Sequence, residues 1–106
     1  ATPPAIGTEA ETLISRGEGW RVVRTVSRGA ASPEGFWYDQ EEDETVFVLS
    51  GEGVIEFETE TATLRPGDGV FIPKRTRHRV RETSELCVWL CVYGEPCGGL
   101  QTRQPQ

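Results

Sequence analysis

A lone histidine is the first residue in this chain whose type points to chemistry. His78 is the only histidine among 106 residues, and it follows a turn and a short apolar run. Because side chains alternate along a strand, His78 shares a face with the apolar Val80 and should point inward. The neighbouring arginines fall on the opposite face and are expected to be solvated; they are Arg77, Arg79 and Arg81. An imidazole inside a barrel can bind a metal, transfer a proton or form a structural hydrogen bond.

Glu44 is the second candidate. It begins an apolar run and shares one face of the predicted strand with Val46 and Val48. A carboxylate buried at that place would be costly unless it were paired or bound to a metal, so His78 is its natural candidate partner. The alternative is a carboxylate that lies in solvent at the start of the strand.

Short strands must position these two groups. Turn residues recur between runs rich in Val, Ile, Phe, Trp, Tyr and Thr, which is typical of an all-β sandwich or barrel. The predicted strands are Thr12–Ser15, Trp20–Val26, Gly35–Tyr38, Thr45–Leu49, Gly53–Glu58, Ala62–Leu64, Val70–Ile72, His78–Arg81 and Leu86–Tyr93. So many short strands must pair or close their edges, which favours an antiparallel jelly-roll β-barrel. No long helix is expected, although a helical turn is possible near Thr8–Leu13.

The last predicted strand, Leu86–Tyr93, is apolar on both faces. One face should look into the barrel, and the other should be covered by another sheet, the N-terminal segment or a second subunit. Cys87 and Cys91 on this strand, together with Cys97, are interpreted as reduced thiols of the core. A disulfide between Cys91 and Cys97 is geometrically possible across the intervening turn.

Charged and aromatic stretches have simple interpretations. The acidic run Glu41–Asp43 and the basic stretch Lys74–Arg81 are expected to be solvated or paired with one another. Trp37, Tyr38, Trp89 and Tyr93 are expected in the core, with Tyr38 the one whose hydroxyl could face a pocket.

Length and composition indicate a single domain over residues 1–106, with a core of about 12–93 and flexible tails at 1–7 and 98–106. The net charge of -6 disfavours nucleic acid and anionic membranes as partners. No apolar run is long enough to span a bilayer, and the N-terminus does not resemble a signal peptide. We therefore expect a cytoplasmic protein without a nucleotide cofactor. Because the sequence has no Met, we expect that an initiator Met or a leader was removed.

The two stretches around the candidate residues resemble the two motifs of the cupin family. Glu44 followed after six residues by Gly51 matches the end of the first motif. Gly67, five residues, Pro73, four residues and then His78 match the second, and the resemblance covers most of the chain. It implies a jelly-roll barrel, usually a homodimer, often with a divalent metal at its centre.

The sequence departs from the family at the start of the first motif, where a His-x-His pair normally precedes the Glu. With three residues before the Glu, the two histidine positions fall on Tyr38 and Gln40; with four, they fall on Trp37 and Asp39. The resemblance therefore implies two metal ligands, the carboxylate of Glu44 and the imidazole of His78. Gln40 or Asp39 could add an oxygen, and Tyr38 a phenolate.

Three functions remain open. The first is a degenerate cupin that binds a small polar molecule, with or without a weakly held divalent metal, because a stable site needs three or four ligands. The second is a small isomerase, epimerase or lyase acting on a carbohydrate or carboxylic acid, with His78 as general base or acid assisted by Glu44 or Tyr38. The third is a dimerising interaction domain without catalysis.

Overall fold

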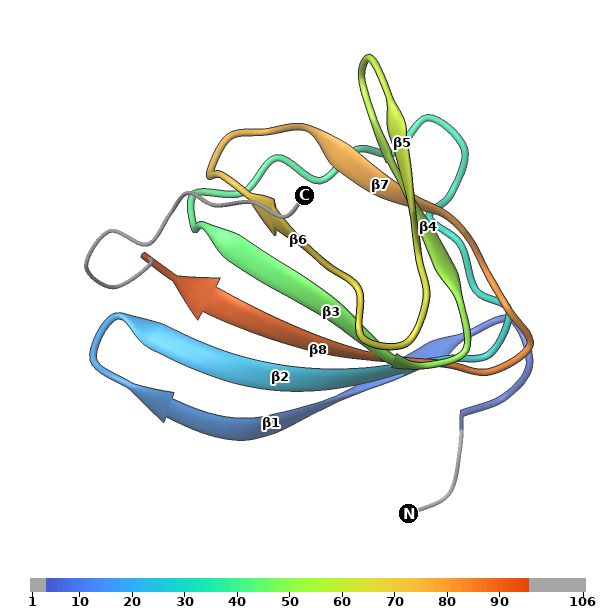
Figure 1. Ribbon diagram of the computed structural model, residues 1–106, viewed down its shortest axis with the longest axis horizontal. Coiled ribbons are helices and arrows are strands. Elements are labelled where there is room, and N and C mark those ends of the chain that lie inside the picture. Colours follow the sequence, from blue (N-terminus) through green and yellow to red (C-terminus); the bar gives the residue numbers. More distant parts are fainter. Residues whose placement is uncertain (1–3, 96–106) are drawn as a thin grey trace.

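Eight strands form the part of the chain that the structure describes. The computed structural model describes residues 4–95 (Figure 1). The strands are β1 (Glu9–Gly17), β2 (Trp20–Ser27), β3 (Glu44–Ser50), β4 (Gly53–Phe57), β5 (Thr61–Leu64), β6 (Gly69–Ile72), β7 (His78–Thr83) and β8 (Cys87–Gly94). Within residues 4–95, no helix could cross a membrane.

The strands pair into two antiparallel sheets. One sheet has the order β1-β2-β8-β3-β6 and the other β5-β4-β7. Figure 1 shows the smaller sheet lying over the larger one, joined to it by the connections that leave β3, β5 and β7. The non-sequential strand order and the antiparallel pairing confirm the jelly-roll barrel that the sequence predicts.

The core lies between the two sheets. Strands β2 and β8 pair along their full length, so alternate residues of both point inward together. Cys87 and Cys91 are buried free thiols there, as expected, whereas Cys97 lies outside the described residues. Trp89 is 4% exposed, and its indole N–H donates to the Ser27 hydroxyl at 3.1 Å. The largest core ring is thus buried without an unpaired donor.

The glycine that ends the first motif is required by the backbone. Gly51 has φ 80°, a left-handed conformation that side chains rarely adopt. A Cβ at this position would lie 2.0 Å from the carbonyl oxygen of Leu86. The turn from β3 into β4 therefore depends on a residue without a side chain.

The predicted strand Gly35–Tyr38 is wrong. This segment is a loop in which Tyr38 alone forms an isolated bridge, with His78. Pro33 lacks an N–H, and Gly35 has φ 83°, so the chain cannot keep a continuous ladder there. The loop nevertheless runs beside β7, because Ser32 and Tyr38 both exchange hydrogen bonds with that strand.

The helical turn considered near Thr8–Leu13 is also wrong. These residues enter β1, which pairs with β2 from Glu9 opposite Ser27 to Gly17 opposite Trp20. The ladder to β2 satisfies backbone groups over nine residues, more than a single helical turn would. The expected short strand Thr12–Ser15 is therefore the middle of a longer one.

The outer face of the larger sheet is apolar and partly open. On β8, Val88, Leu90 and Val92 alternate with the buried residues and remain half-buried. Leu49 and Phe71, on the neighbouring strands, are 51% and 40% exposed. An apolar sheet face of this kind is typical of a surface that associates with another.

Candidate functional site

A cavity of about 90 Å³ opens between the two sheets. Its walls are mainly aliphatic and aromatic side chains from both sheets. Its polar lining includes Glu9, Glu11, Thr25, Tyr38, Gln40, Glu44, His78 and Tyr93. An apolar pocket with a few convergent polar groups is the usual form of a small-molecule site.

Glu44 is buried at the inner side of the cavity. It is the first residue of β3 and pairs with Tyr93 on one side and Ile72 on the other, so its strand is central. Its Oε1 accepts a hydrogen bond from Nε2 of Gln40 at 3.1 Å. Burial raises the pKa of Glu44, and hydrogen bonds from Gln40, Cys91 and Tyr93 together with the charge of His78 oppose that rise.

His78 is held in one orientation by its own loop. Nδ1 lies 2.8 Å from the carbonyl oxygen of Thr76, and since a carbonyl only accepts, Nδ1 must carry the proton. In the neutral ring, Nε2 then has a free lone pair, and it lies 3.7 Å from Oε1 of Glu44. The His78 side chain is only 6% exposed. This arrangement, one ring nitrogen fixed by a carbonyl and the other free, is the one that metal-binding and proton-transferring histidines use.

Tyr38 covers the imidazole. Its ring stacks on that of His78 with the centroids 5.4 Å apart and the planes 24° apart. Burial raises the pKa of Tyr38, and the negative charges of Glu9, Glu11 and Glu44 raise it further. Both effects disfavour the phenolate form of Tyr38.

The structure brings together four of the five residues that the sequence singles out. Tyr38 and Gln40 line the cavity beside Glu44 and His78, so the register with three intervening residues is the one that faces inward. Asp39 does not line the cavity; its carboxylate pairs with Nε of Arg75 at 2.8 Å. Asp39 is thus misplaced as a metal ligand, because its carboxylate pairs with Arg75 outside the cavity.

Sequence reasoning missed the acidic residues of β1. Glu9 and Glu11 lie opposite Ser27 and Thr25 of β2, so their side chains share the inner face of the sheet. Both residues are exposed and both line the cavity, which places them at its open side. The alternation of Glu9, Glu11 and Leu13 was the available signal, and interpreting the segment as a helical turn concealed it.

Arg79 was expected in solvent, and this expectation is wrong. Its side chain is 16% exposed, and Nη1 lies 2.8 Å from Oε1 of Glu56 on β4. Nη2 donates to the carbonyl oxygen of Ser32 at 3.0 Å. The loop that precedes β3 lies over the outer side of β7 and covers this arginine. Its guanidinium therefore ties the loop that carries Tyr38 to the smaller sheet.

The neighbouring charged residues pair as expected, but only in part. Arg75 lies 3.7 Å from Glu41, and the backbone N–H of Lys74 donates to Asp43 at 2.8 Å. Arg77 instead pairs with Glu58 at 2.9 Å. The basic stretch thus divides its partners between the acidic run and the hairpin of β4 and β5.

The donor set does not fit a tightly held divalent metal, although the fold often carries one. Among residues 4–95, no group of three His, Cys, Asp or Glu side chains is arranged to hold a metal ion. Glu44 and His78 provide two ligands, whereas stable sites use three or four. Gln40 donates its amide N–H toward Glu44, so its contribution is a hydrogen bond to the carboxylate.

Comparison with known proteins agrees with this geometry. A family model described as a cupin domain matches residues 22–93. A solved structure from Ralstonia eutropha, provisionally assigned as a mannose-6-phosphate isomerase, is 40% identical with a TM-score of 0.82, over 91% of this chain and 94% of that one. An RmlC-like cupin from Shewanella frigidimarina has a TM-score of 0.73 at 14% identity, over 90% of this chain and 83% of that one, and so shows the fold alone.

The relatives known from sequence are less informative about function. An uncharacterised protein of Aquifex aeolicus is 42% identical over 62 residues, which are 58% of this chain and 51% of that protein. The chain spans about half the length of the curated relatives it matches. The segment that matches the cupin family model, residues 22–93, covers most of the barrel from β2 to β8 and contains both Glu44 and His78. The chain therefore belongs to the cupin family.

Proposed function

We propose that this chain binds a small polar molecule in the barrel cavity, with His78 and Glu44 as its central polar contacts. The observation that carries the proposal is the free lone pair of His78. Nε2 belongs to a side chain that is 6% exposed, and it has no hydrogen-bond partner among the described residues. A ligand hydroxyl or N–H would give this nitrogen the hydrogen bond that it lacks.

The walls of the cavity suit the rest of such a ligand. Val46, Ile55 and Ile72 offer aliphatic contacts, while Tyr38 and Gln40 add groups that can donate hydrogen bonds. A compound with a short carbon skeleton and at least one hydroxyl matches this lining.

A divalent metal has at most a secondary part in this proposal. With only Glu44 and His78 as ligands, an ion would be held weakly and water would fill the remaining positions. Ligand binding should therefore survive treatment with a chelator. One tightly held divalent ion per chain after that treatment, measured by elemental analysis, would contradict this part of the proposal.

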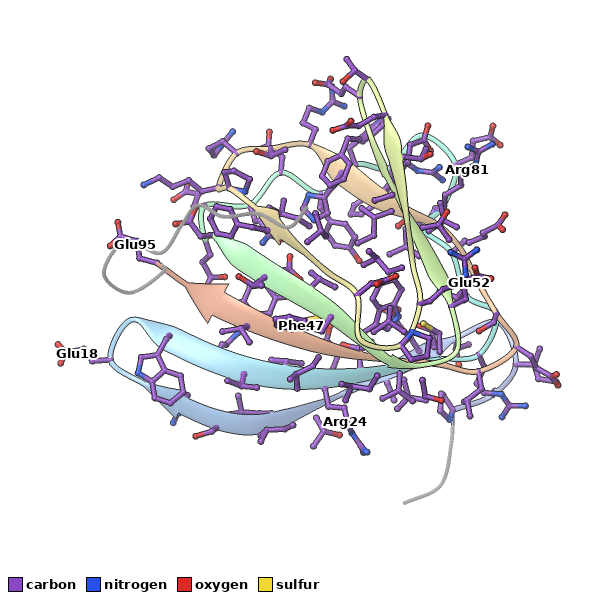
Figure 2. All side chains as sticks on the ribbon, in the orientation of Figure 1. Glu18, Arg24, Phe47, Glu52, Arg81 and Glu95 are labelled. Atoms are coloured by element: carbon purple, nitrogen blue, oxygen red, sulfur yellow. The ribbon has the colours of Figure 1, made fainter. Side chains whose placement is uncertain are left out.

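The proposal is tested by replacing the imidazole. Binding of a panel of small hydroxylated compounds is followed by protein-observed NMR for the wild-type chain, for His78→Ala and for the control Arg81→Ala. Arg81 is exposed on the same strand, and Figure 2 shows its side chain directed away from the barrel. We expect His78→Ala to weaken binding by about tenfold, the loss of one buried hydrogen bond. If His78→Ala binds every compound as tightly as Arg81→Ala does, the cavity is not the site.

A second candidate function is proton transfer by the same pair. The fixed tautomer of His78 provides a base at Nε2, and the raised pKa of Glu44 favours a carboxyl group that can donate a proton. The provisional isomerase assignment of the Ralstonia protein adds a carbohydrate as a possible substrate. In this reaction Nε2 takes the proton from the carbon next to a carbonyl group, and Glu44 protonates the carbonyl oxygen, which gives an enediol.

Isotope exchange tests this second candidate. In deuterated water, the proton on the carbon next to the carbonyl of mannose or of mannose 6-phosphate should be lost from the proton NMR spectrum. His78→Ala and Glu44→Gln should each abolish that loss. A wild-type chain that exchanges neither sugar above the rate of buffer alone would remove this candidate.

We infer in addition that the chain forms a homodimer through the outer face of its larger sheet. The half-buried Val88, Leu90 and Val92 of β8 share this face with the exposed Leu49 of β3 and Phe71 of β6, and a second copy would bury them. Light scattering after gel filtration should give twice the mass of one chain, and Leu90→Glu should give a monomer. A monomeric wild type at micromolar concentration would leave this face without a partner.

A further inference from the structure

The open side of the cavity is acidic. Glu9 and Glu11 project from β1 onto the inner face of the sheet, across from the buried Glu44. Three of the residues that line the cavity are therefore carboxylic acids. The lining contains no Lys or Arg. The lining thus offers negative charge at its mouth and at its inner side.

The neighbouring arginines do not neutralise this charge. Arg21 pairs with Glu42 and stacks over the ring of Tyr93, outside the cavity. Arg24 lies on the same strand but faces the other way, and Figure 2 shows it pointing out from the larger sheet. Arg28 donates to the carbonyl oxygen of Pro4. None of these three guanidinium groups lines the cavity, and neither does that of Arg16, which lies opposite Arg21 on β1.

The three carboxyl groups of Glu9, Glu11 and Glu44 line the same cavity. Burial raises the pKa of the Tyr38 hydroxyl, and the negative charges of Glu9, Glu11 and Glu44 raise it further, which agrees with their common place in the lining. Nδ1 of His78 donates to Thr76, and Nε2 lies 3.7 Å from Oε1 of Glu44. Rings that line the cavity, including those of Tyr38 and Trp89, add π-faces that attract cations.

The imidazole of His78 is the second feature of the cavity that could bind a ligand. The His78 side chain is 6% exposed and lines the cavity, and Nε2 forms no hydrogen bond with the described residues. The acidic residues at the mouth and the imidazole thus line one cavity of about 90 Å³.

We propose that the ligand is a small organic cation, with an ammonium group between Glu9 and Glu11 and a hydroxyl group on Nε2 of His78. This inference rests on the proposed function, because it names the chemical class that the same cavity takes. It disfavours phosphorylated and carboxylated compounds, which the three carboxylates would repel. The cationic class and the second candidate function with mannose 6-phosphate as substrate therefore exclude each other.

Three probes of nearly equal size test the charge of the ligand. They are 4-amino-1-butanol, the neutral 1,4-butanediol and the anionic 4-hydroxybutyrate, with binding followed by protein-observed NMR at low and at high salt. We expect the amine to bind about tenfold more tightly than the diol, and the anion most weakly. High salt should remove most of the advantage of the amine, because the mouth is exposed and its charges are screened.

A double variant locates the effect. Glu9→Gln with Glu11→Gln should bring the affinities for amine and diol to within about twofold of each other. The control combines Glu18→Gln and Glu85→Gln, which remove the same charge from exposed positions that do not line the cavity. Glu18 lies at the tip of the hairpin between β1 and β2 (Figure 2). This control should keep the preference for the amine.

The outcomes separate this inference from the function on which it rests. If the diol or the anion binds as tightly as the amine, or if the variant at Glu9 and Glu11 behaves like its control, the cationic class is wrong. Binding that His78→Ala still weakens would then leave the cavity as the site. If His78→Ala changes the affinity for none of the probes, the site itself is wrong, and the inference fails with it.

Discussion

Two pairs of side chains meet in the cavity, and they are held there in different ways. Glu44 and His78 lie on strands whose backbone ladders fix their positions, at the start of β3 and the start of β7. Tyr38 and Gln40 lie on a loop that is attached to β7 by separate contacts. The strand pair depends on the barrel as a whole, whereas the loop pair depends on a few hydrogen bonds that can be removed one at a time.

The largest expected effect comes from the turn that sets β3 and β4. Gly51→Ala should destabilise the chain by about 3 kcal/mol, because its Cβ would meet the Leu86 carbonyl oxygen at 2.0 Å in addition to the cost of a positive φ. Gly29→Ala is the matched control, since Gly29 also has a positive φ but open space around it, and should cost about 1 kcal/mol. Urea denaturation measures both, and equal losses would mean that the contact with Leu86 is unimportant.

The next effect concerns the attachment of the loop. Arg79→Leu should cost about 1–2 kcal/mol, because Glu56 and the Ser32 carbonyl both lose a charged donor. It should also shift the NMR signals of Tyr38 and Gln40 more than those of Glu44. Arg77→Leu breaks an exposed pair with Glu58 and should cost about 0.5 kcal/mol or less. If the two variants are equally stable, Arg79 does not hold the loop.

A pH dependence reports on the strand pair. Burial raises the pKa of Glu44 in the folded chain above its unfolded value, so the folded state binds that proton more tightly. The stability that this proton contributes is present below the unfolded pKa and is lost as the pH rises through the folded pKa. Between about pH 4 and pH 8, the free energy of unfolding of Glu44→Gln should therefore increase relative to that of the wild type. Parallel curves would show that Glu44 titrates as an ordinary glutamate.

The smallest effect is expected for the loop pair. Tyr38→Phe keeps the ring stacked on His78 and removes only a hydroxyl, so stability should change by about 0.5 kcal/mol or less. Affinity for a hydroxylated ligand should still fall if that hydroxyl faces it. Unfolding curves measure the stability of this variant, and NMR titrations measure its affinity for the ligand. An unchanged affinity would restrict the role of Tyr38 to packing.

The sequence was most informative where the structure is regular. Glu44 and His78 could be placed from strand alternation and from the spacing of the two motifs, because a period of two decides which side chains face inward. Asp39 and Gln40 could not be separated, since the loop before β3 has no such period. Arg79 followed the alternation, but the loop that covers it belongs to a distant segment. The alternation around Glu9 is compatible with a strand, but which face of that strand points inward depends on its pairing with β2.

The hydrogen bond that orients His78 has a consequence for variation at this site. Its acceptor is the main-chain oxygen of Thr76, two residues earlier, so exchanging the side chain at position 76 does not remove it. Only a change in the path of the backbone there would do so, and Arg75, with φ 62°, is where that path is most unusual. The backbone conformation of the turn therefore determines that Nδ1 carries the proton. Substitutions of the side chains around the turn should leave this unchanged.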